Sequence, residues 1–496
     1  MTTPPPARPF PDFFRPALAA LGAALLVLGG HFWMIERASS PWPVHDQWLA
    51  EGEMLYVPIV ENRLAWPLLF HAHAEHRIAP TRLLALTLFQ LNDRQWDVRL
   101  QMTVNSFLAA ALAGMLVLVA APQLGKWTLV WFATGFGALL ASPLFYGNAL
   151  WGFQSQFYFL ILFSVAHLTL VLRCPVRSAP WFVGLICSLL AIVSMGSGFF
   201  SAAIVALLAT WTLWRSADVV ERRTAMTNLT LHLILSGAAI AWAPARSAVS
   251  YDLGATVHTF LHCLSWPHRF YTPWGAWVWI PFLLFSGAFL RRRTASAPEK
   301  LVMALGAWVL AQIIAISVAR SAPAIVITPR YYELFWTGLT TNVLALPFLW
   351  RLFTEAGVSR LVRAVVALLF VAWLAPVSFK AWSFAESHWR HDLPAMATFA
   401  AHQTTHVTAF LATDQLRELQ AAPYPNVPHP DAGYLAGQLR NPLVRNALAS
   451  VLDPATAPAL SRWAASLRSV PPLGWFAGGE LLLIAAGLFR RRSAIQ

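Results

Sequence analysis

The chain has 496 residues, of which 57% are hydrophobic and only 11% are charged, and it contains 24 tryptophans. Together with a mean hydropathy of +0.55, this composition excludes an ordinary soluble domain and predicts a polytopic membrane protein. The net charge of +13 does not indicate a nucleic-acid partner, because the arginines form short clusters at the ends of apolar runs, as topology signals do. Three cysteines without a repeated spacing predict neither a disulfide framework nor a zinc site.

The start of the chain, 1–13, is rich in proline and is expected to be a disordered cytoplasmic tail. An apolar run from about Pro16 to Ile35 follows Arg8 and Arg15. We interpret this run as an uncleaved first span, because it is long for the apolar part of a signal peptide and no A-x-A cleavage site follows it cleanly.

Apolar windows along the chain predict about twelve transmembrane helices. They lie at 14–35, 99–121, 127–143, 151–172, 179–194, 197–214, 227–243, 272–290, 299–319, 331–350, 361–379 and 472–489. Basic clusters such as Arg291 to Arg293 fall at alternate ends of these windows. Since Lys and Arg accumulate on the cytoplasmic side, both termini are expected there. The predicted fold class is therefore an all-α polytopic membrane protein.

Two predicted outer segments are too long to be simple connections. The first outer loop, 36–98, combines tryptophans with clustered charge, which indicates interfacial helices along the membrane surface. The periplasmic segment, 380–471, alternates polar and apolar residues around the Pro-rich stretch Ala422 to Pro430 and is expected to form a small outer unit. The predicted domains are the tail 1–13, a transmembrane core 14–379 that includes the first outer loop, the segment 380–471, and a last helix with a basic cytoplasmic end, 472–496.

Asp46, shortly after the first span, is the leading catalytic candidate. A carboxylate at this place can accept a proton from a sugar hydroxyl as it attacks an anomeric carbon, or can hold a metal ion that does the same work. The alternative is a solvated acid that caps a surface helix. The nearby acids Glu51, Glu53 and Glu61 are expected to lie at the surface.

A second ionisable group, Glu75-His76-Arg77, is followed by Arg82. The two guanidinium groups are suited to bind a donor phosphate, since each can donate two hydrogen bonds to one anion. Glu75 could orient the base, and His76 could contact the acceptor or sugar. The alternative is the charged first turn of an interfacial helix. A metal site that includes His71 is considered but not predicted, so the cofactor prediction is none, with a divalent metal left open.

Amide and indole groups lie at the outer end of the fourth predicted span, in Asn148, Trp151, Gln154 and Gln156. Such groups can bind the hydroxyls of an acceptor or sugar. The alternative is that the glutamines join membrane helices through hydrogen bonds.

Arginine also precedes the tenth predicted span, at Arg320 and at Arg330-Tyr331. Arginine at membrane depth is costly and marks a pathway or a ligand, and a lipid phosphate is its natural partner on this face. The alternative is that Arg330 extends to the lipid headgroups beside an aromatic belt.

Taken together, Asp46, the EHR element at 75–77, the NALWGFQSQF stretch at 148–157 and the RYY stretch at 330–332 resemble bacterial membrane proteins related to GT-C glycosyltransferases. The resemblance covers roughly residues 14–350. It implies an inner-membrane enzyme of the cell envelope that moves a sugar from a polyprenyl-phosphate donor to a glycan, lipid or protein acceptor on the outer face. Asp46 matches the family's first-loop acid. The family commonly pairs two acids there, whereas Gln47 follows Asp46 in this chain, so Glu75 is the candidate second carboxylate.

The expected mechanism is direct displacement with inversion, in which Asp46 removes the acceptor proton and Arg77 and Arg330 stabilise the departing lipid phosphate. The expected partners are the polyprenyl-linked sugar, membrane lipids and a glycan acceptor. Two other functions are kept open. An O-antigen ligase or polymerase would depend on histidines and arginines of the outer segments, and a lipid or glycan transporter would contain helices broken near mid-membrane.

Overall fold

The computed structural model describes residues 11–244, 252–268, 273–320, 327–354 and 357–488. In these ranges the chain is almost entirely helical, and the only sheet is an antiparallel hairpin of β1 (Ala72–His73) and β2 (His76–Arg77). The predicted all-α class is confirmed. The expectations for a disordered tail and for a basic C-terminal end concern, for the most part, residues outside the described ranges.

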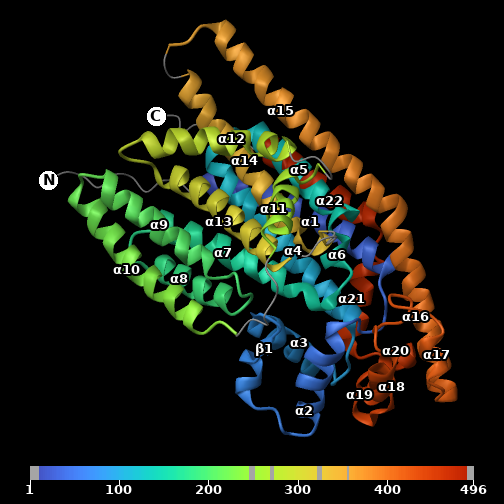
Figure 1. The fold of residues 1–496 in the computed structure, drawn as a ribbon. Helices are drawn as coiled ribbons and strands as arrows, with labels where there is room; N and C mark the ends of the chain where they lie inside the picture. The colour runs from blue at the N-terminus through green and yellow to red at the C-terminus, as the bar shows by residue number, and fades with distance from the viewer. Residues whose placement is uncertain (1–10, 245–251, 269–272, 321–326, 355–356, 489–496) are drawn as a thin grey trace.

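The helical bundle and its connections contain both long helices and short turns (Figure 1). The bundle helices are α1 (Pro11–Ala38), α4 (Val98–Ala120), α5 (Lys126–Leu140), α6 (Tyr146–Ala149), α7 (Ser155–Arg173), α8 (Ala179–Ile192), α9 (Phe200–Arg215), α10 (Val219–Ala241), α11 (Leu253–Ser265), α12 (Pro273–Arg291), α13 (Ala297–Ala319), α14 (Tyr332–Thr354), α15 (Arg360–Ser387) and α22 (Pro472–Leu488). Short turns between them are η3 (Ala121–Gln123), η4 (Pro143–Phe145), η5 (Gly152–Gln154) and η6 (Pro329–Tyr331).

The remaining helical segments belong to two long connections. The first contains η1 (Trp48–Tyr56), α2 (Val57–Val60), η2 (Trp66–Phe70) and α3 (Ala79–Leu91). The second contains η7 (His388–Asp392), α16 (Leu393–Thr413), α17 (Arg417–Gln420), α18 (Ala432–Arg440), α19 (Pro442–Ala447), α20 (Ala449–Leu452), η8 (Pro454–Thr456) and α21 (Ala459–Ser469).

Six of the described helices are long and apolar enough to cross a membrane, and the number rises to eight if each of two bent helix pairs forms one span. The bent pairs are Lys126–Leu140 with Pro143–Ala149, at 52°, and Ala459–Ser469 with Pro472–Leu488, at 71°. A helix occupies each of the twelve predicted windows, although several of these helices are shorter than a full span. The chain is therefore an α-helical membrane protein.

α1 lies at the centre of the bundle and packs against α4, α5 and α22. Glycines allow these backbones to approach closely, as small residues do between membrane helices. A Cβ atom on Gly22 would lie 2.9 Å from the carbonyl oxygen of Gly479, and a Cβ on Gly30 would lie 2.0 Å from that of Ala141. The contact between α1 and α22 brings the two ends of the described chain together.

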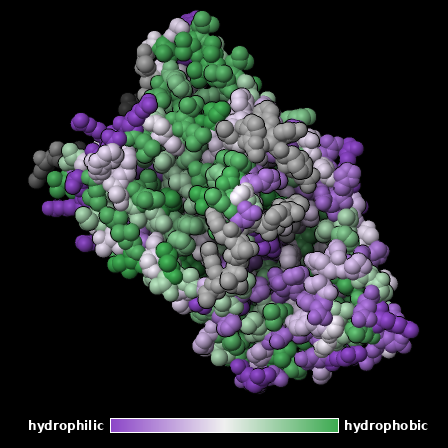
Figure 2. All heavy atoms as spheres, in the orientation of Figure 1, coloured by the Kyte–Doolittle hydropathy of each residue, from purple (hydrophilic) through white to green (hydrophobic). Residues whose placement is uncertain are grey.

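The two long connections, residues 39–97 and 388–470, pack against each other and form what we call the polar lobe (Figures 1 and 2). The Trp96 amide donates to the Ala447 carbonyl at 2.6 Å, and the Gln95 side chain donates to the Asn446 carbonyl at 3.0 Å. Figure 2 shows hydrophilic residues gathered on this lobe, while hydrophobic residues dominate the bundle beside it. Two segments separated by about 300 residues thus build one structural unit.

The boundary predicted between 379 and 380 falls inside a helix. α15, η7 and α16 form one helical run of 54 residues, Arg360–Thr413, which leaves the bundle and continues along the polar lobe. Lys380 therefore lies inside this helical run, and the segment 380–471 starts as an extension of a bundle helix.

Candidate functional site

A cavity of about 610 Å³ opens where the bundle meets the polar lobe. Its lining comes from the end of α1 and the loop after it, the α6 region, the segments at both ends of the α13–α14 connection, α16, and the loop after α17. Four residues predicted from the sequence line this cavity: Asp46, Trp151, Arg320 and Arg330. The fold therefore brings the candidate base and two candidate phosphate ligands together.

The Asp46 carboxylate is paired with two imidazoles. His45 Nδ1 lies 2.8 Å from Oδ1, and His73 Nε2 lies 3.8 Å from Oδ2. Partial burial raises the pKa of Asp46, but hydrogen bonds and positive charge from His45 and His73 outweigh burial and hold that pKa well below its usual range. The hydrogen bond with Asp46 in turn raises the pKa of His45 above its usual value. At neutral pH Asp46 is ionised, so it presents acceptor oxygens to the cavity.

The turn that presents Asp46 is held in an unusual backbone conformation. His45 has a φ of 51°, in the left-handed region that non-glycine residues rarely adopt and that persists only where the surroundings fix it. The His45 amide donates to the Pro428 carbonyl at 2.8 Å, and the Val44 amide donates to the Gln47 side chain at 3.3 Å. Contacts from the polar lobe and from Gln47 therefore fix the direction of the Asp46 side chain.

Behind this turn lies a buried polar network centred on Glu51. The prediction that Glu51 lies at the surface is wrong, since only 1% of the residue is exposed. Its Oε2 accepts hydrogen bonds from Gln101 Nε2 at 2.9 Å, Trp96 Nε1 at 3.1 Å and Gln47 Nε2 at 3.3 Å. Burial raises the pKa of Glu51 to about 7, an effect that the hydrogen bonds from Gln101, Gln47 and Trp96 reduce.

Glu51 should make stability fall as pH rises. Because its pKa is about 7 in the fold against 4.5 ordinarily, the folded state holds the proton over this interval while the unfolded chain releases it. The free energy of unfolding therefore falls by about 3 kcal/mol between about pH 4.5 and 7, and it does not fall further above that range. Thermal unfolding in detergent at pH 5 and pH 8 should show a larger loss for the wild type than for Glu51→Gln. Equal losses would show that Glu51 does not titrate in this range.

The two arginines of the cavity keep most of their donors for a ligand. Arg330 Nε donates to Thr328 Oγ1 at 3.1 Å, and its guanidinium lies over the Tyr331 ring at 5.5 Å. Arg320 Nε donates to the Tyr331 hydroxyl at 3.2 Å. Neither arginine uses an Nη group in a hydrogen bond with the described residues, so each has four N–H donors left. This arrangement suits a phosphate group.

A second cavity of about 330 Å³ adjoins the first and shares Arg320 with it. Glu75, His76 and Tyr331 also line it, beside a largely apolar wall from α9, α10, α13 and α14. The β1–β2 hairpin reaches both sites, because its residue His73 contacts Asp46 while Glu75 and His76 line the second cavity. Glu75 therefore does not line the cavity of Asp46.

Arg77 and Arg82 lie outside both cavities and bind backbone carbonyls. Arg77 donates to the Trp242 carbonyl from Nε at 3.2 Å and from Nη2 at 3.0 Å, and it stacks on the Trp242 ring at 4.2 Å. It also donates to the Phe70 carbonyl at 2.7 Å. Arg82 is buried and donates to the carbonyls of Leu68, Leu69 and His71. Both side chains therefore bind backbone carbonyls of residues 68–71, the segment directly before the β1–β2 hairpin.

Arg82→Ala should destabilise the polar lobe. The substitution leaves the carbonyls of Leu68, Leu69 and His71 without their donor, the Leu69 carbonyl in a buried residue, and hydrogen bonds to a charged group each contribute about 1.5–3 kcal/mol. We expect the free energy of unfolding to fall by at least about 3 kcal/mol, measured by thermal or urea unfolding in detergent. The control is Arg63→Ala, which removes an exposed arginine whose side chain is paired, among the described residues, with Glu61 alone. Equal stability of the two variants would contradict this role for Arg82.

In the predicted sugar-binding stretch, 148–157, one residue lines the first cavity and another holds a neighbouring segment in place. Trp151 lines the first cavity. Asn148 is fully buried and donates to the Arg330 carbonyl at 2.9 Å and to Glu333 Oε2 at 2.7 Å, so it anchors the segment that carries Arg330. Gln154 and Gln156 are buried and line neither cavity.

The sequence did not identify the lining residues contributed by the second long connection, 388–470. Gln403 and Tyr424 line the first cavity, although they lie more than 350 residues after Asp46. The only local signal was the Pro-rich stretch that contains Tyr424. For a divalent metal, the described ranges contain no group of three or more His, Cys, Asp or Glu side chains placed to hold an ion.

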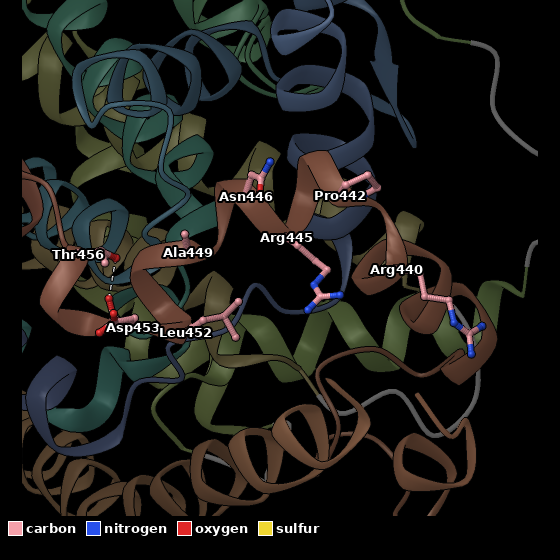
Figure 3. Close-up of a pocket in the computed structure, with 8 residues that line it drawn as sticks. All are labelled: Arg440, Pro442, Arg445, Asn446, Ala449, Leu452, Asp453 and Thr456. Atoms are coloured by element: carbon pink, nitrogen blue, oxygen red, sulfur yellow. Dashed lines mark hydrogen bonds between the residues drawn. The ribbon is translucent and has the colours of Figure 1, made fainter. Parts of the chain in front are cut away.

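Another hollow lies on the polar lobe, between α18 and η8 (Figure 3). It has a volume of about 520 Å³ and shares no lining residue with the cavity of Asp46. Arg440, at its edge, is paired with Asp414 at 2.8 Å.

Comparison of the chain with models of known protein families, with curated proteins and with solved structures finds no match.

Proposed function

We propose that the protein is a GT-C-type membrane glycosyltransferase that moves a sugar from a polyprenyl-phosphate donor to a cell-envelope glycan, lipid or protein acceptor. One observation carries the proposal: an ionised carboxylate, Asp46, and two arginines with available donors, Arg320 and Arg330, line one cavity between an apolar bundle and a polar lobe. A lipid-linked sugar needs such a boundary, because its carrier is apolar and its acceptor lies in water.

The proposed reaction is a direct displacement at the anomeric carbon. An acceptor hydroxyl attacks that carbon, and Asp46 takes its proton as the new carbon–oxygen bond forms. The bond from the anomeric carbon to the phosphate oxygen breaks, and its electron pair leaves with the phosphate. Arg320 and Arg330 stabilise the charge that develops there. Attack opposite to the leaving phosphate inverts the anomeric configuration.

The second cavity is the proposed place for the first isoprene units of the donor. Phe200, Ile240 and Leu334 contribute to its apolar wall, and Arg320 lies at the boundary between the two cavities. A phosphate bound by Arg320 would thus have the sugar on the Asp46 side and the chain on the other. In this arrangement Glu75 does not act on the acceptor with Asp46, and Arg77 and Arg82 are not donor ligands.

The number of spans and their orientation in the membrane are part of the same proposal. We place twelve spans in a bacterial inner membrane, both termini in the cytoplasm and the polar lobe in the periplasm. The helices in all twelve windows support this count, and so does the gathering of the predicted outer segments at one end of the bundle. Cysteine labelling of intact cells at Asp431 and at Arg222, each replaced by Cys, tests the orientation.

Purified protein in liposomes provides the direct test of activity. We expect it to transfer radiolabelled hexose or pentose from synthetic polyprenyl phosphates to extracted envelope glycans or lipids. If no polyprenyl-phosphate sugar is consumed across the common sugars, the glycosyltransferase proposal fails.

The alternative functions receive less support. A ligase that depends on the C-terminal histidines and arginines would have them line the site. The residues that 386–468 contribute to the lining of the first cavity include neither type, and His429 lies beside His45 with its ring 6.0 Å away. The two cavities lie at the end of the bundle next to the polar lobe, which does not favour a transport path through its middle.

A further inference from the structure

The loop that follows α17 is held against the turn of Asp46. The Pro428 carbonyl accepts the His45 amide at 2.8 Å. Two side chains of α16 fix the same loop: Gln403 Nε2 donates to the Pro425 carbonyl at 2.8 Å, and His402 Nδ1 lies 2.6 Å from Asn426 Oδ1. The loop is therefore a fixed wall of the first cavity.

Tyr424 is the residue by which this wall faces the site. Its ring meets the His45 ring edge to face at 5.7 Å, and it lines the same cavity as Asp46 and Arg330. Burial and then the negative charge of Asp46 raise the pKa of Tyr424, while Arg330 opposes the shift. The phenol thus keeps its proton at neutral pH. Its hydroxyl makes no hydrogen bond with any residue that the structure describes.

We infer that Tyr424 is a substrate-binding residue, and that its hydroxyl donates a hydrogen bond to an oxygen of the hydroxyl-bearing acceptor beside Asp46. The inference rests on the proposed function. A phenol offers both an apolar face and a polar tip, a combination that suits a sugar ring with its hydroxyls. The contact with His45 places Tyr424 on the acceptor side, whereas Arg320 connects the phosphate with the second cavity.

The inference makes the C-terminal segment part of the site. Gln403 and His402 then act as positioning residues, because their side chains bind the loop that carries Tyr424. Acceptor choice would depend on a segment distant in sequence from the candidate base, which allows the acceptor to change while the donor site stays the same.

The test uses Tyr424→Phe, which removes only the hydroxyl, with Tyr434→Phe as the matched control. Tyr434 donates to Glu53 at 3.1 Å and does not line the cavity. Binding of methyl hexosides, as hydroxyl-bearing probes, and of undecaprenyl phosphate is measured on the full chain by saturation-transfer NMR. One lost hydrogen bond should weaken hexoside binding about 3- to 10-fold in Tyr424→Phe, without changing undecaprenyl phosphate binding. Tyr434→Phe should change neither.

Three other results of these measurements separate the proposed function from the inference about Tyr424. If the wild type binds neither probe and transfers no sugar, the proposed function fails. If the wild type binds both and Tyr424→Phe binds the hexosides as tightly as the wild type, the inference about Tyr424 is overturned while the function stands. If Tyr424→Phe instead weakens only undecaprenyl phosphate binding, Tyr424 belongs to the donor phosphate site, which also overturns the inference. Thermal unfolding of both variants verifies that they are folded.

Discussion

Asp46→Asn should lower the rate of sugar transfer by about 100- to 10,000-fold, the range expected for loss of a positioned general base. The amide has the size of the carboxylate and can still bind an imidazole, so the turn around His45 should keep its structure. It cannot accept a proton from the acceptor hydroxyl. The measurement is transfer from a polyprenyl-phosphate sugar in liposomes, at saturating donor.

The control for Asp46 is Asp414→Asn, which removes an exposed carboxylate paired with Arg440 on the polar lobe. This variant should transfer sugar at the wild-type rate. Wild-type transfer by Asp46→Asn would exclude Asp46 as the base. If Asp46→Asn also unfolds at a clearly lower temperature, His45→Gln serves as a second variant, because it removes the imidazole of the same pair and keeps the Asp46 carboxylate. A loss of stability without a comparable loss of transfer in His45→Gln then separates the structural effect from the chemical one.

Arg320→Ala should weaken binding of undecaprenyl phosphate about 10- to 100-fold, because hydrogen bonds to a charged group contribute about 1.5–3 kcal/mol. Arg320 is the residue shared by the two cavities, so its loss removes the ligand at the point where the phosphate meets the chain. Equilibrium binding of the lipid to purified protein in detergent gives the measurement. Raising the salt concentration should weaken wild-type binding more than binding by the variant.

Arg77→Ala is the informative comparison for Arg320. Both arginines are phosphate candidates by sequence, but Arg77 binds the carbonyls of Phe70 and Trp242 and lines neither cavity. We therefore expect Arg77→Ala to bind undecaprenyl phosphate as the wild type does, once its fold is verified. The reverse result, with affinity lost in Arg77→Ala and kept in Arg320→Ala, would move the donor site to the hollow beside Trp242.

The helical class of this protein could be predicted because it depends on local composition. A long apolar window excludes alternatives to a helix in a membrane, since every backbone group must find its partner within the segment. Helices accordingly occupy all twelve predicted windows. The same local argument could not find the course of α15, because a helix can continue from an apolar into a polar environment without a break in its hydrogen bonds, as Arg360–Thr413 does.

The charged residues of the first connection, 39–97, show why the sequence could not predict which side chains form the site. The sequence grouped Asp46 with Glu75, Arg77 and Arg82 because they are close along the chain. The hairpin turns between them, so Asp46 and Glu75 line different cavities and the two arginines bind backbone carbonyls. Acids are mostly exposed in proteins, so the sequence predicts Glu51 at the surface. Burial by Trp96 and Gln101 depends on contacts across 45 and 50 residues, which no local pattern reveals.

The sequence by itself determined that this is an α-helical membrane protein, and it selected Asp46, Arg320 and Arg330 as candidates, because composition and the cost of charge near a membrane act residue by residue. Only the tertiary structure decided which of the candidates share a cavity and that Tyr424 joins them. The reason is physical: a cavity is formed by side chains from distant segments, and their convergence depends on the packing of the bundle against the polar lobe.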